Sequence, residues 1–337
     1  LTVKGNWINN GTYTATGTGS TVIFAGTTQS LQGSVVTTFR RLTINAGSVT
    51  TLNTNVTVSG SSSRTTVKGT LDPGESPTYK LTGTIFTVNA NARIKVKGAI
   101  FTDNYTNSGT VTLNSNSIVE YAATAVNQTI SSTYTYSTII ISGAGIKSLA
   151  ANLTALRSSA TSNGNITVNA GTLDLGTFTA NRGTSTTGGS FTVASGAFLK
   201  IGGTNTFPAN YATVTLNLTS TVEYSGTNQA VSAKTYGNLI LSSSSGAATK
   251  TMPATAFVIG KDFTSNIGTG TSVSYTAASN ITVSGNVNIG TATTFNGASF
   301  THNIAGSWTN SGTFTGTTST INMTGDGSVI SGTGVHN

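Results

Sequence analysis

The chain has 337 residues and a net charge of +8, yet only 7% of its side chains are charged and 36% are hydrophobic. Disorder is a poor explanation because the apolar residues alternate, and long helices are excluded because β-branched residues and glycine dominate. Cysteine is absent, which removes disulfides and thiolate sites. No apolar run reaches the ~18–20 residues of a membrane helix, so we predict an all-β chain without membrane insertion.

The first residues resemble the end of a repeated unit. Leu1-Thr2-Val3-Lys4-Gly5 matches Ile94-Lys95-Val96-Lys97-Gly98, and no signal peptide precedes it. The last residues, 335–337, stop where another apolar strand should begin. We therefore expect the sequence to be a segment of a longer protein.

A strand phrase then recurs four times. Its copies are Ser20-Thr21-Val22-Ile23-Phe24, Ser117-Ile118-Val119-Glu120-Tyr121, Ser220-Thr221-Val222-Glu223-Tyr224 and Ser319-Thr320-Ile321-Asn322-Met323, which begin 97, 103 and 99 residues apart. Two apolar residues stand two positions apart in each copy, so both point to one face of a strand. The position between them faces water.

The similarity extends to both sides of this phrase. Gln29, Gln128 and Gln229 follow it in three copies, with Ser328 in the fourth, and an aromatic residue and an apolar strand come next. Upstream, residues 5–12 reappear at 306–313. The chain therefore forms super-repeats of about 100 residues, at approximately 5–97, 98–202, 203–305 and a partial fourth at 306–337.

A shorter period distinguishes two architectures for these super-repeats. Apolar strand centres fall at Val22, Ile44, Val67, Val88 and Val111, with gaps of 22, 23, 21 and 23 residues. One coil per gap predicts a parallel β-helix, right-handed by default. Because only four prolines occur and no linker separates the modules, we predict one continuous solenoid over 1–337. Tandem β-sandwiches are the alternative.

Few residues could carry catalysis. Glu120 and Glu223 share one position of the phrase, but Ile23 and Asn322 replace them elsewhere, so we interpret both as exposed strand residues. Asp72-Pro73-Gly74-Glu75 is typical of a turn. The other acids and the two histidines are isolated in sequence: Asp103, Asp174, Asp262, Asp326, His302 and His336. We predict no catalytic, cofactor-binding or metal site, and hence no enzyme.

Basic and aromatic residues admit a structural and a binding interpretation. Arg40-Arg41 and the cluster of Arg93, Lys95 and Lys97 would keep the surface soluble, or would attract acidic polymers. Without a stripe of aromatic and basic residues we predict no specific nucleic-acid binding. Trp7, Trp308 and Tyr105 share one module position, where a core aromatic is favoured over a platform for stacking sugars.

The combined pattern resembles a known class of repeats. Its parts are G-N-W-x-N-x-G-T, S-T-V-x-F-x-G-x-x-Q, an L-x-I strand, G-T-L-D at 171–174 and F-T-V-x-x-G-A-x-L-x-x-G-G at 191–203. Together they resemble repeat regions of very large secreted surface proteins of Bacteroidetes-type bacteria. The resemblance implies export by the type IX route, which relies on a sorting domain not found here, and an adhesin-like or matrix-forming role. Arg40-Arg41 and Ala212 depart from the pattern.

We therefore expect a structural or adhesive shaft of an extracellular bacterial surface protein or fibre, without catalysis or cofactor. Its partners would be further copies or the rest of a longer chain, with extracellular polysaccharide as a candidate ligand. A carbohydrate-binding or polysaccharide-degrading β-helix is the alternative, and it would need acids converging in a groove. An ice- or mineral-binding face would need a regular Thr-x-Thr ladder, of which Thr12/Thr14, Thr213/Thr215 and Thr313/Thr315 supply a fragment.

Overall fold

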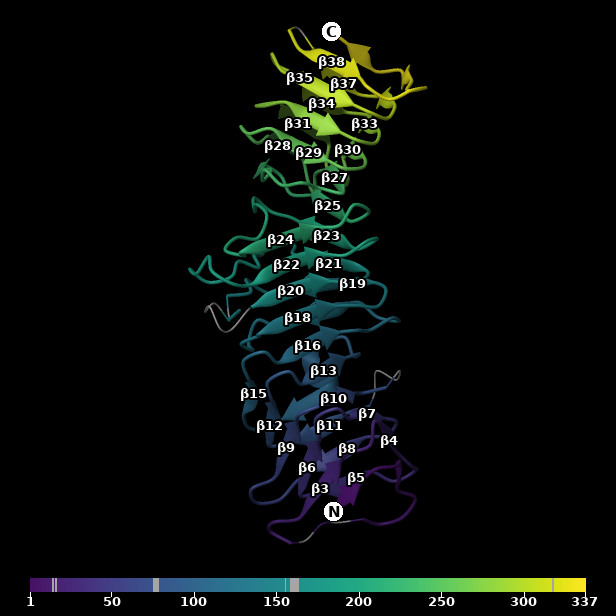
Figure 1. The fold of residues 1–337 in the computed structure, drawn as a ribbon, viewed down its shortest axis with the longest axis vertical. Coiled ribbons are helices and arrows are strands. Elements are labelled where there is room, and N and C mark those ends of the chain that lie inside the picture. Colours follow the sequence, from purple (N-terminus) through teal and green to yellow (C-terminus); the bar gives the residue numbers. More distant parts are fainter. Residues whose placement is uncertain (14, 16, 75–78, 155, 158–163, 317) are drawn as a thin grey trace. The chain divides into compact units, whose positions relative to one another are not determined.

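The computed structural model describes residues 1–337 except 14, 16, 75–78, 155, 158–163 and 317. The chain divides into two compact units. The first comprises Leu1–Thr167, Asn181–Phe191 and Asn210–Thr213, and the second comprises Val168–Ala180, Thr192–Ala209 and Val214–Asn337. Each unit is built almost entirely from short parallel strands stacked coil upon coil (Figure 1).

Three sheets form the walls of the first unit. Sheet A contains β1 (Thr2–Val3), β3 (Thr21–Phe24), β6 (Arg41–Ile44), β9 (Arg64–Val67), β12 (Ile85–Val88) and β15 (Val111–Leu113). Sheet B contains β2 (Trp7–Ile8), β4 (Thr28–Gln32), β7 (Val49–Leu52), β10 (Thr70–Asp72), β13 (Arg93–Val96), β16 (Ile118–Tyr121) and β18 (Thr138–Ile141). Sheet C contains β5 (Thr37–Phe39), β8 (Val56–Val58), β11 (Leu81–Gly83) and β14 (Tyr105–Asn107).

Other elements of this part of the chain are short. The helix α1 spans Phe101–Asn104, and β17 (Gln128–Ile130) and β19 (Ile146–Leu149) begin the strand order of sheet D. Sheet B continues with three strands whose residues divide between the units: β20 (Asn165–Val168), β22 (Ser190–Val193) and β24 (Thr213–Leu216).

The second unit also has three sheets. Sheet D contains β21 (Thr172–Asp174), β23 (Phe198–Ile201), β25 (Thr221–Tyr224), β27 (Asn238–Leu241), β30 (Phe263–Ser265), β33 (Val287–Ile289), β36 (Trp308–Asn310) and β39 (Ile330–Ser331). Sheet E contains β26 (Gln229–Ala230), β28 (Ala247–Thr251), β31 (Ser272–Thr276), β34 (Thr293–Asn296), β37 (Thr313–Thr315) and β40 (Val335–His336). Sheet F contains β29 (Phe257–Ile259), β32 (Ile281–Val283), β35 (Thr301–Ile304) and β38 (Thr320–Met323).

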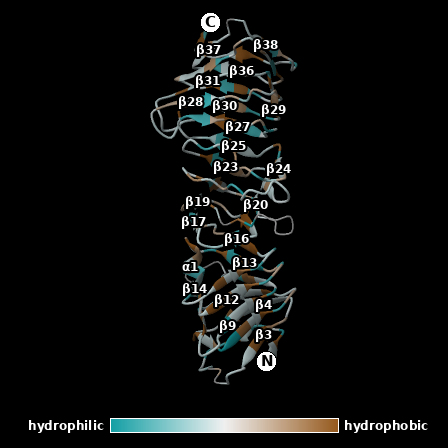
Figure 2. Cartoon of the chain, turned by 90° about the vertical axis from the view of Figure 1, so that its left-hand side faces the viewer, coloured by the Kyte–Doolittle hydropathy of each residue, from teal (hydrophilic) through white to brown (hydrophobic). Residues whose placement is uncertain are grey.

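The alternation along each strand explains why the coils stack. Val22 and Phe24 of β3 are buried, while Thr21 and Ile23 are only half-buried. Phe24 pairs with Ile44 of β6, and Ile44 pairs with Val67 of β9. Apolar side chains thus form columns inside the coils, and hydrophobic residues alternate with polar ones along the strands (Figure 2).

These parallel pairings identify the fold as a β-solenoid, as the short period predicted. Tandem sandwiches are wrong, because sandwich sheets are antiparallel whereas β3, β6, β9 and β12 pair in parallel. The expected series of strand centres is shifted by two residues at its two ends: Val22 pairs with Leu42, and Val88 with Leu113. A shift of two keeps the same face inward, so the buried set is unchanged. The continuity of the solenoid over 1–337 stays a prediction.

The four copies of the strand phrase lie in four different sheets. They form β3 of sheet A, β16 of sheet B, β25 of sheet D and β38 of sheet F. A spacing near 100 residues is therefore not a whole number of coils. Since every wall needs an alternating strand followed by a corner, the same phrase suits each of them.

Candidate functional site

Charged residues that are distant in sequence meet on the outward face of sheet B. The Asp72 carboxylate lies 2.8 Å from Lys95 Nζ and 3.7 Å from Lys97 Nζ. Arg93 Nη1 lies 3.2 Å from Glu120 Oε2. We call these five residues the charged ladder. Parallel stacking creates it, because β10, β13 and β16 are neighbouring strands.

The ladder has three cationic and two anionic side chains, and each carboxylate is paired with a cation of a neighbouring coil. Burial disfavours the Lys95 ammonium, but the hydrogen bond that it donates to Asp72 and the charges of Asp72 and Glu120 outweigh this effect and raise the pKa of Lys95. Glu120 also accepts a hydrogen bond from Ser142 Oγ at 2.6 Å. A lysine stands between the two carboxylates, so they do not share an open groove as a glycosidase pair would.

The second unit repeats this arrangement in weaker form. Asp174, Lys200 and Glu223 stand side by side on sheet D. Glu223 accepts a hydrogen bond from Ser242, as Glu120 does from Ser142. In the described structure, the Lys200 ammonium lies more than 4.0 Å from the carboxylate oxygens of Asp174 and Glu223, so this trio forms no ion pair. The expected exposure of these two strand residues, Glu120 and Glu223, is wrong: Glu120 is buried and Glu223 is half-buried, because both make coil-to-coil contacts.

The three glutamines after the strand phrase are corner residues that the sequence did not assign a role. Gln29 accepts a hydrogen bond from Gly26 N at 2.6 Å and donates to Val3 O and Gly5 O of the preceding coil. Gln128 and Gln229 make the equivalent bonds in their own coils. All three side chains are buried. Their recurrence at one position of the repeat could have predicted a structural role for them.

The glycines beside these glutamines permit the close approach of the coils. A Cβ atom on Gly26 would lie 2.2 Å from Lys4 O, and one on Gly226 would lie 1.8 Å from Gly203 O. In the fourth copy Ser328 replaces the glutamine, and its hydroxyl donates to Ala305 O at 3.0 Å. The corner of the phrase therefore joins each coil to the one before.

Two buried lysines lie on the strands next to these glutamines, and no sequence motif marked them. Lys147 pairs with Gln128, and Lys250 pairs with Gln229. Lys250 Nζ donates to Gly226 O at 2.6 Å and to Gln229 Oε1 at 2.7 Å, and Lys147 Nζ donates to Ala123 O at 3.0 Å.

Burial changes the acidity of both lysines. Desolvation lowers the pKa of Lys147 to about 8 and that of Lys250 to about 7. Each side chain is at most 1% exposed, so neither can reach an external substrate. These lysines satisfy carbonyl groups inside the corners.

The histidines and aromatic residues of interest are also structural. Burial lowers the pKa of His302; its Nδ1 accepts from Ile281 N at 3.3 Å and its Nε2 donates to Gly297 O at 3.1 Å. Trp308 and Tyr105 are buried in the core, and Trp7 Nε1 donates to Thr37 Oγ1. The core interpretation of this module position is confirmed.

The remaining acids stay apart. Asp103 accepts from Ile100 N at 3.1 Å at the start of α1, and Asp262 accepts from Asn286 N at 2.7 Å. Asp326 is exposed, and Glu75 lies outside the described residues. Among the described residues no three acidic or histidine side chains gather where they could hold a metal ion, and no helix is long and apolar enough to span a membrane.

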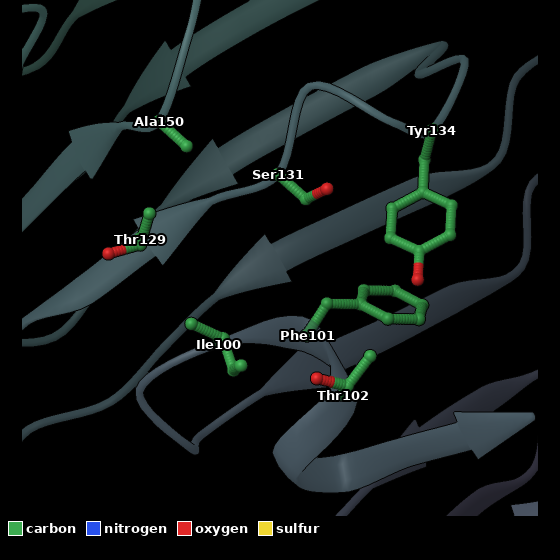
Figure 3. Close-up of a pocket in the computed structure, with 7 residues that line it drawn as sticks. All are labelled: Ile100, Phe101, Thr102, Thr129, Ser131, Tyr134 and Ala150. Atoms are coloured by element: carbon green, nitrogen blue, oxygen red, sulfur yellow. The ribbon is translucent and has the colours of Figure 1, made fainter.

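A hollow of about 200 Å³ lies beside α1 (Figure 3). Phe101 and Tyr134 pack against each other at one side of it with ring centroids 4.3 Å apart, and Thr129 and Ser131 also line it. Tyr134 also borders a second hollow of about 240 Å³, which Arg157 lines. No sequence motif marks this site, because its residues come from separate coils.

Comparison with known proteins adds no assignment. A scan of protein-family models, a search of curated proteins and a search of solved structures each gave no match. The fold places the chain in the structural class of parallel β-solenoids.

Proposed function

We propose that this chain is a structural or adhesive shaft of an extracellular bacterial surface protein. One observation carries the proposal: the side chains that could do chemistry are engaged in contacts within the solenoid. The corner glutamines, the buried lysines and the charged ladder all bind neighbouring coils instead of converging on an open site. A shaft needs such contacts, because each coil depends on its neighbours.

The surface composition supports the same role. Thr, Ser and Asn face water on the strands, and charged residues are few. Such a surface is compatible with close packing of copies or with neutral polymers. The resemblance to repeats of secreted surface proteins supplies the proposed location and the proposed adhesive task.

A cellular experiment tests this proposal. In the bacterium that produces the protein, intact cells would be treated with an external protease and probed with an antibody against this chain. We expect cleavage on intact cells, and weaker attachment to surfaces after the segment is deleted. Protection of the segment on intact cells, or unchanged attachment without it, would overturn the proposal.

Carbohydrate binding is the second candidate, and the hollow at Tyr134 favours it. The half-buried Tyr134 ring, nearby hydroxyls and the Arg157 guanidinium, one nitrogen of which already donates to Leu113 O, can together contact and hydrogen-bond a sugar. Binding of soluble polysaccharides to the purified chain should weaken in Tyr134→Ala. Tyr13→Ala removes a half-buried ring elsewhere and is the matched control. Equal binding by both variants would dismiss the site.

A further inference from the structure

Sheet E carries a regular array of small hydroxyl side chains. On β28, β31, β34 and β37 alternate residues point outward, and the strand register aligns them in two columns. The columns are Thr249, Ser274, Thr294 and Thr313, and Thr251, Thr276, Asn296 and Thr315. Every coil therefore presents a Thr-x-Thr element or a close relative, and we call these residues the hydroxyl array.

The hydroxyl array has two fixed repeats. Neighbouring strands lie about 4.8 Å apart, and alternate residues of a strand lie ~6.7 Å apart. A two-dimensional repeat of this kind can match a ligand only if the ligand repeats in two dimensions as well. The natural partner is the face of a crystal.

Buried aromatic rings hold the array in register. Tyr275, Phe295 and Phe314 occupy the inward positions between its columns. Tyr275 and Phe295 are stacked with centroids 4.9 Å apart and an interplanar angle of 17°, and Phe295 lies 5.5 Å from Phe314. Large rings with few rotamers keep the backbone above them in place, so the hydroxyls are positioned before any ligand arrives.

The array is uncharged, and most of it is not engaged in other bonds. In the described structure the hydroxyls of Thr251, Thr276 and Thr294 form no hydrogen bond with the protein; those of Thr313 and Thr315 form none either. The lysine of β28, Lys250, points inward. A charged mineral face would call for charged side chains, and a sugar crystal for exposed aromatic rings. A hydroxyl donates and accepts as water does.

Two other sheets each offer one threonine column. On sheet C the column is Thr38, Thr57, Thr82 and Thr106, but its strands carry no second column beside it, and Thr106 Oγ1 already donates to Thr102 O at 2.7 Å. Sheet A has a threonine column of Thr43, Thr66, Thr87 and Thr112, but Arg41 and Arg64 stand in the column beside it. On sheet D the outward column includes Thr264, Asn288 and Thr309, and Asp262 and Asn286, which precede two of these strands, already accept hydrogen bonds from the backbone of the next coil.

We propose that the hydroxyl array of sheet E binds ice. Its hydroxyls, about 4.8 Å apart along each column and ~6.7 Å apart across the columns, would hold water molecules in a regular array, and those waters would join the crystal. Adsorption at many weak contacts would resist further growth. This activity is independent of the structural role proposed above.

The test uses the whole chain and ice alone. Fluorescently labelled protein would be mixed into water around a growing ice hemisphere, and ice recrystallisation would be recorded in parallel. We expect incorporation into ice and inhibited recrystallisation. Thr294→Tyr should abolish both, because the ring projects from the centre of the array, while tyrosine remains a good strand residue.

Controls separate binding from misfolding. Thr87→Tyr makes the same change in the threonine column of sheet A and should leave both readouts unchanged. Thr294→Val removes only the hydroxyl and preserves the shape, and it should weaken both. The melting temperature of each variant is measured first. Exclusion of the wild-type chain from ice, or equal loss in Thr87→Tyr and Thr294→Tyr, would overturn the proposal.

Discussion

Phe24 in β3 lies directly beside Ile44 in β6, one coil further along the chain, and both side chains are fully buried. This contact is the unit of the fold, since each apolar column repeats it. Phe24→Ala should reduce the free energy of unfolding by about 3–5 kcal/mol through the cavity it leaves. Hydrogen exchange should rise in the adjacent coils as well. Exchange confined to one super-repeat, with a sharp boundary, would contradict stacking of this kind.

The corner glutamines allow a test of coil-to-coil bonding. Gln229→Leu leaves Gly226 N and Asn205 O without their partner and removes one acceptor from Lys250 Nζ, whereas Ile201 O keeps its bond from Ser225 N. We expect a loss of about 1–3 kcal/mol for each buried group left unpaired, measured by denaturant unfolding. Gln32→Leu, at a half-buried position of β4, is the control and should change stability little.

Lys250 makes stability depend on pH. Its folded pKa is about 7, below the ordinary value, so the unfolded chain binds more protons between about pH 7 and 10. The free energy of unfolding should therefore rise with pH across this window, and the contribution should be lost as pH falls to 7. Lys250→Met should remove the dependence between about pH 7 and 8, whereas Lys147, with a pKa lowered to about 8, still contributes above pH 8. An unchanged slope in the variant would show that Lys250 is not buried as described.

His302 makes stability depend on pH in a lower range than Lys250 does. Burial lowers its pKa below the ordinary value of 6.5, so the unfolded state binds more protons just below neutrality. Acid should therefore destabilise the second unit as pH falls through the folded pKa, because protonation breaks the bond from Ile281 N. Thermal unfolding between neutral and acidic pH would measure this effect. His302→Gln should be less sensitive to acid.

Replacing the two glutamates of the strand phrase should change the stability of the protein by different amounts and should leave its activity unchanged in both cases. Glu120→Gln loses an ion pair with Arg93, whereas Glu223→Gln loses no ion pair among the described residues. The first change should cost more, by about 1 kcal/mol or less, since the partner arginine is partly exposed. Neither variant, nor the double variant, should alter polysaccharide turnover. Loss of a cleavage activity in the double variant would contradict the non-catalytic proposal.

The sequence by itself determined the class of the fold and its buried face. Alternation of apolar residues sets which side chains turn inward, and the period of the strand centres indicates coils, because both depend only on local spacing. The strand phrase also marked Phe24, Tyr121 and Tyr224 as buried residues, and the structure confirms this.

Only the tertiary structure decided which distant residues meet. The charged ladder, the lysines above the corner glutamines and the hydroxyl array depend on the register between coils, and coil length varies along the chain. Thr313 and Thr315 form a Thr-x-Thr fragment in the sequence, but only the pairing of β34 with β37 places Thr294 beside Thr313. Register follows from the length of every intervening corner, so a one-residue change would turn these side chains to the opposite face.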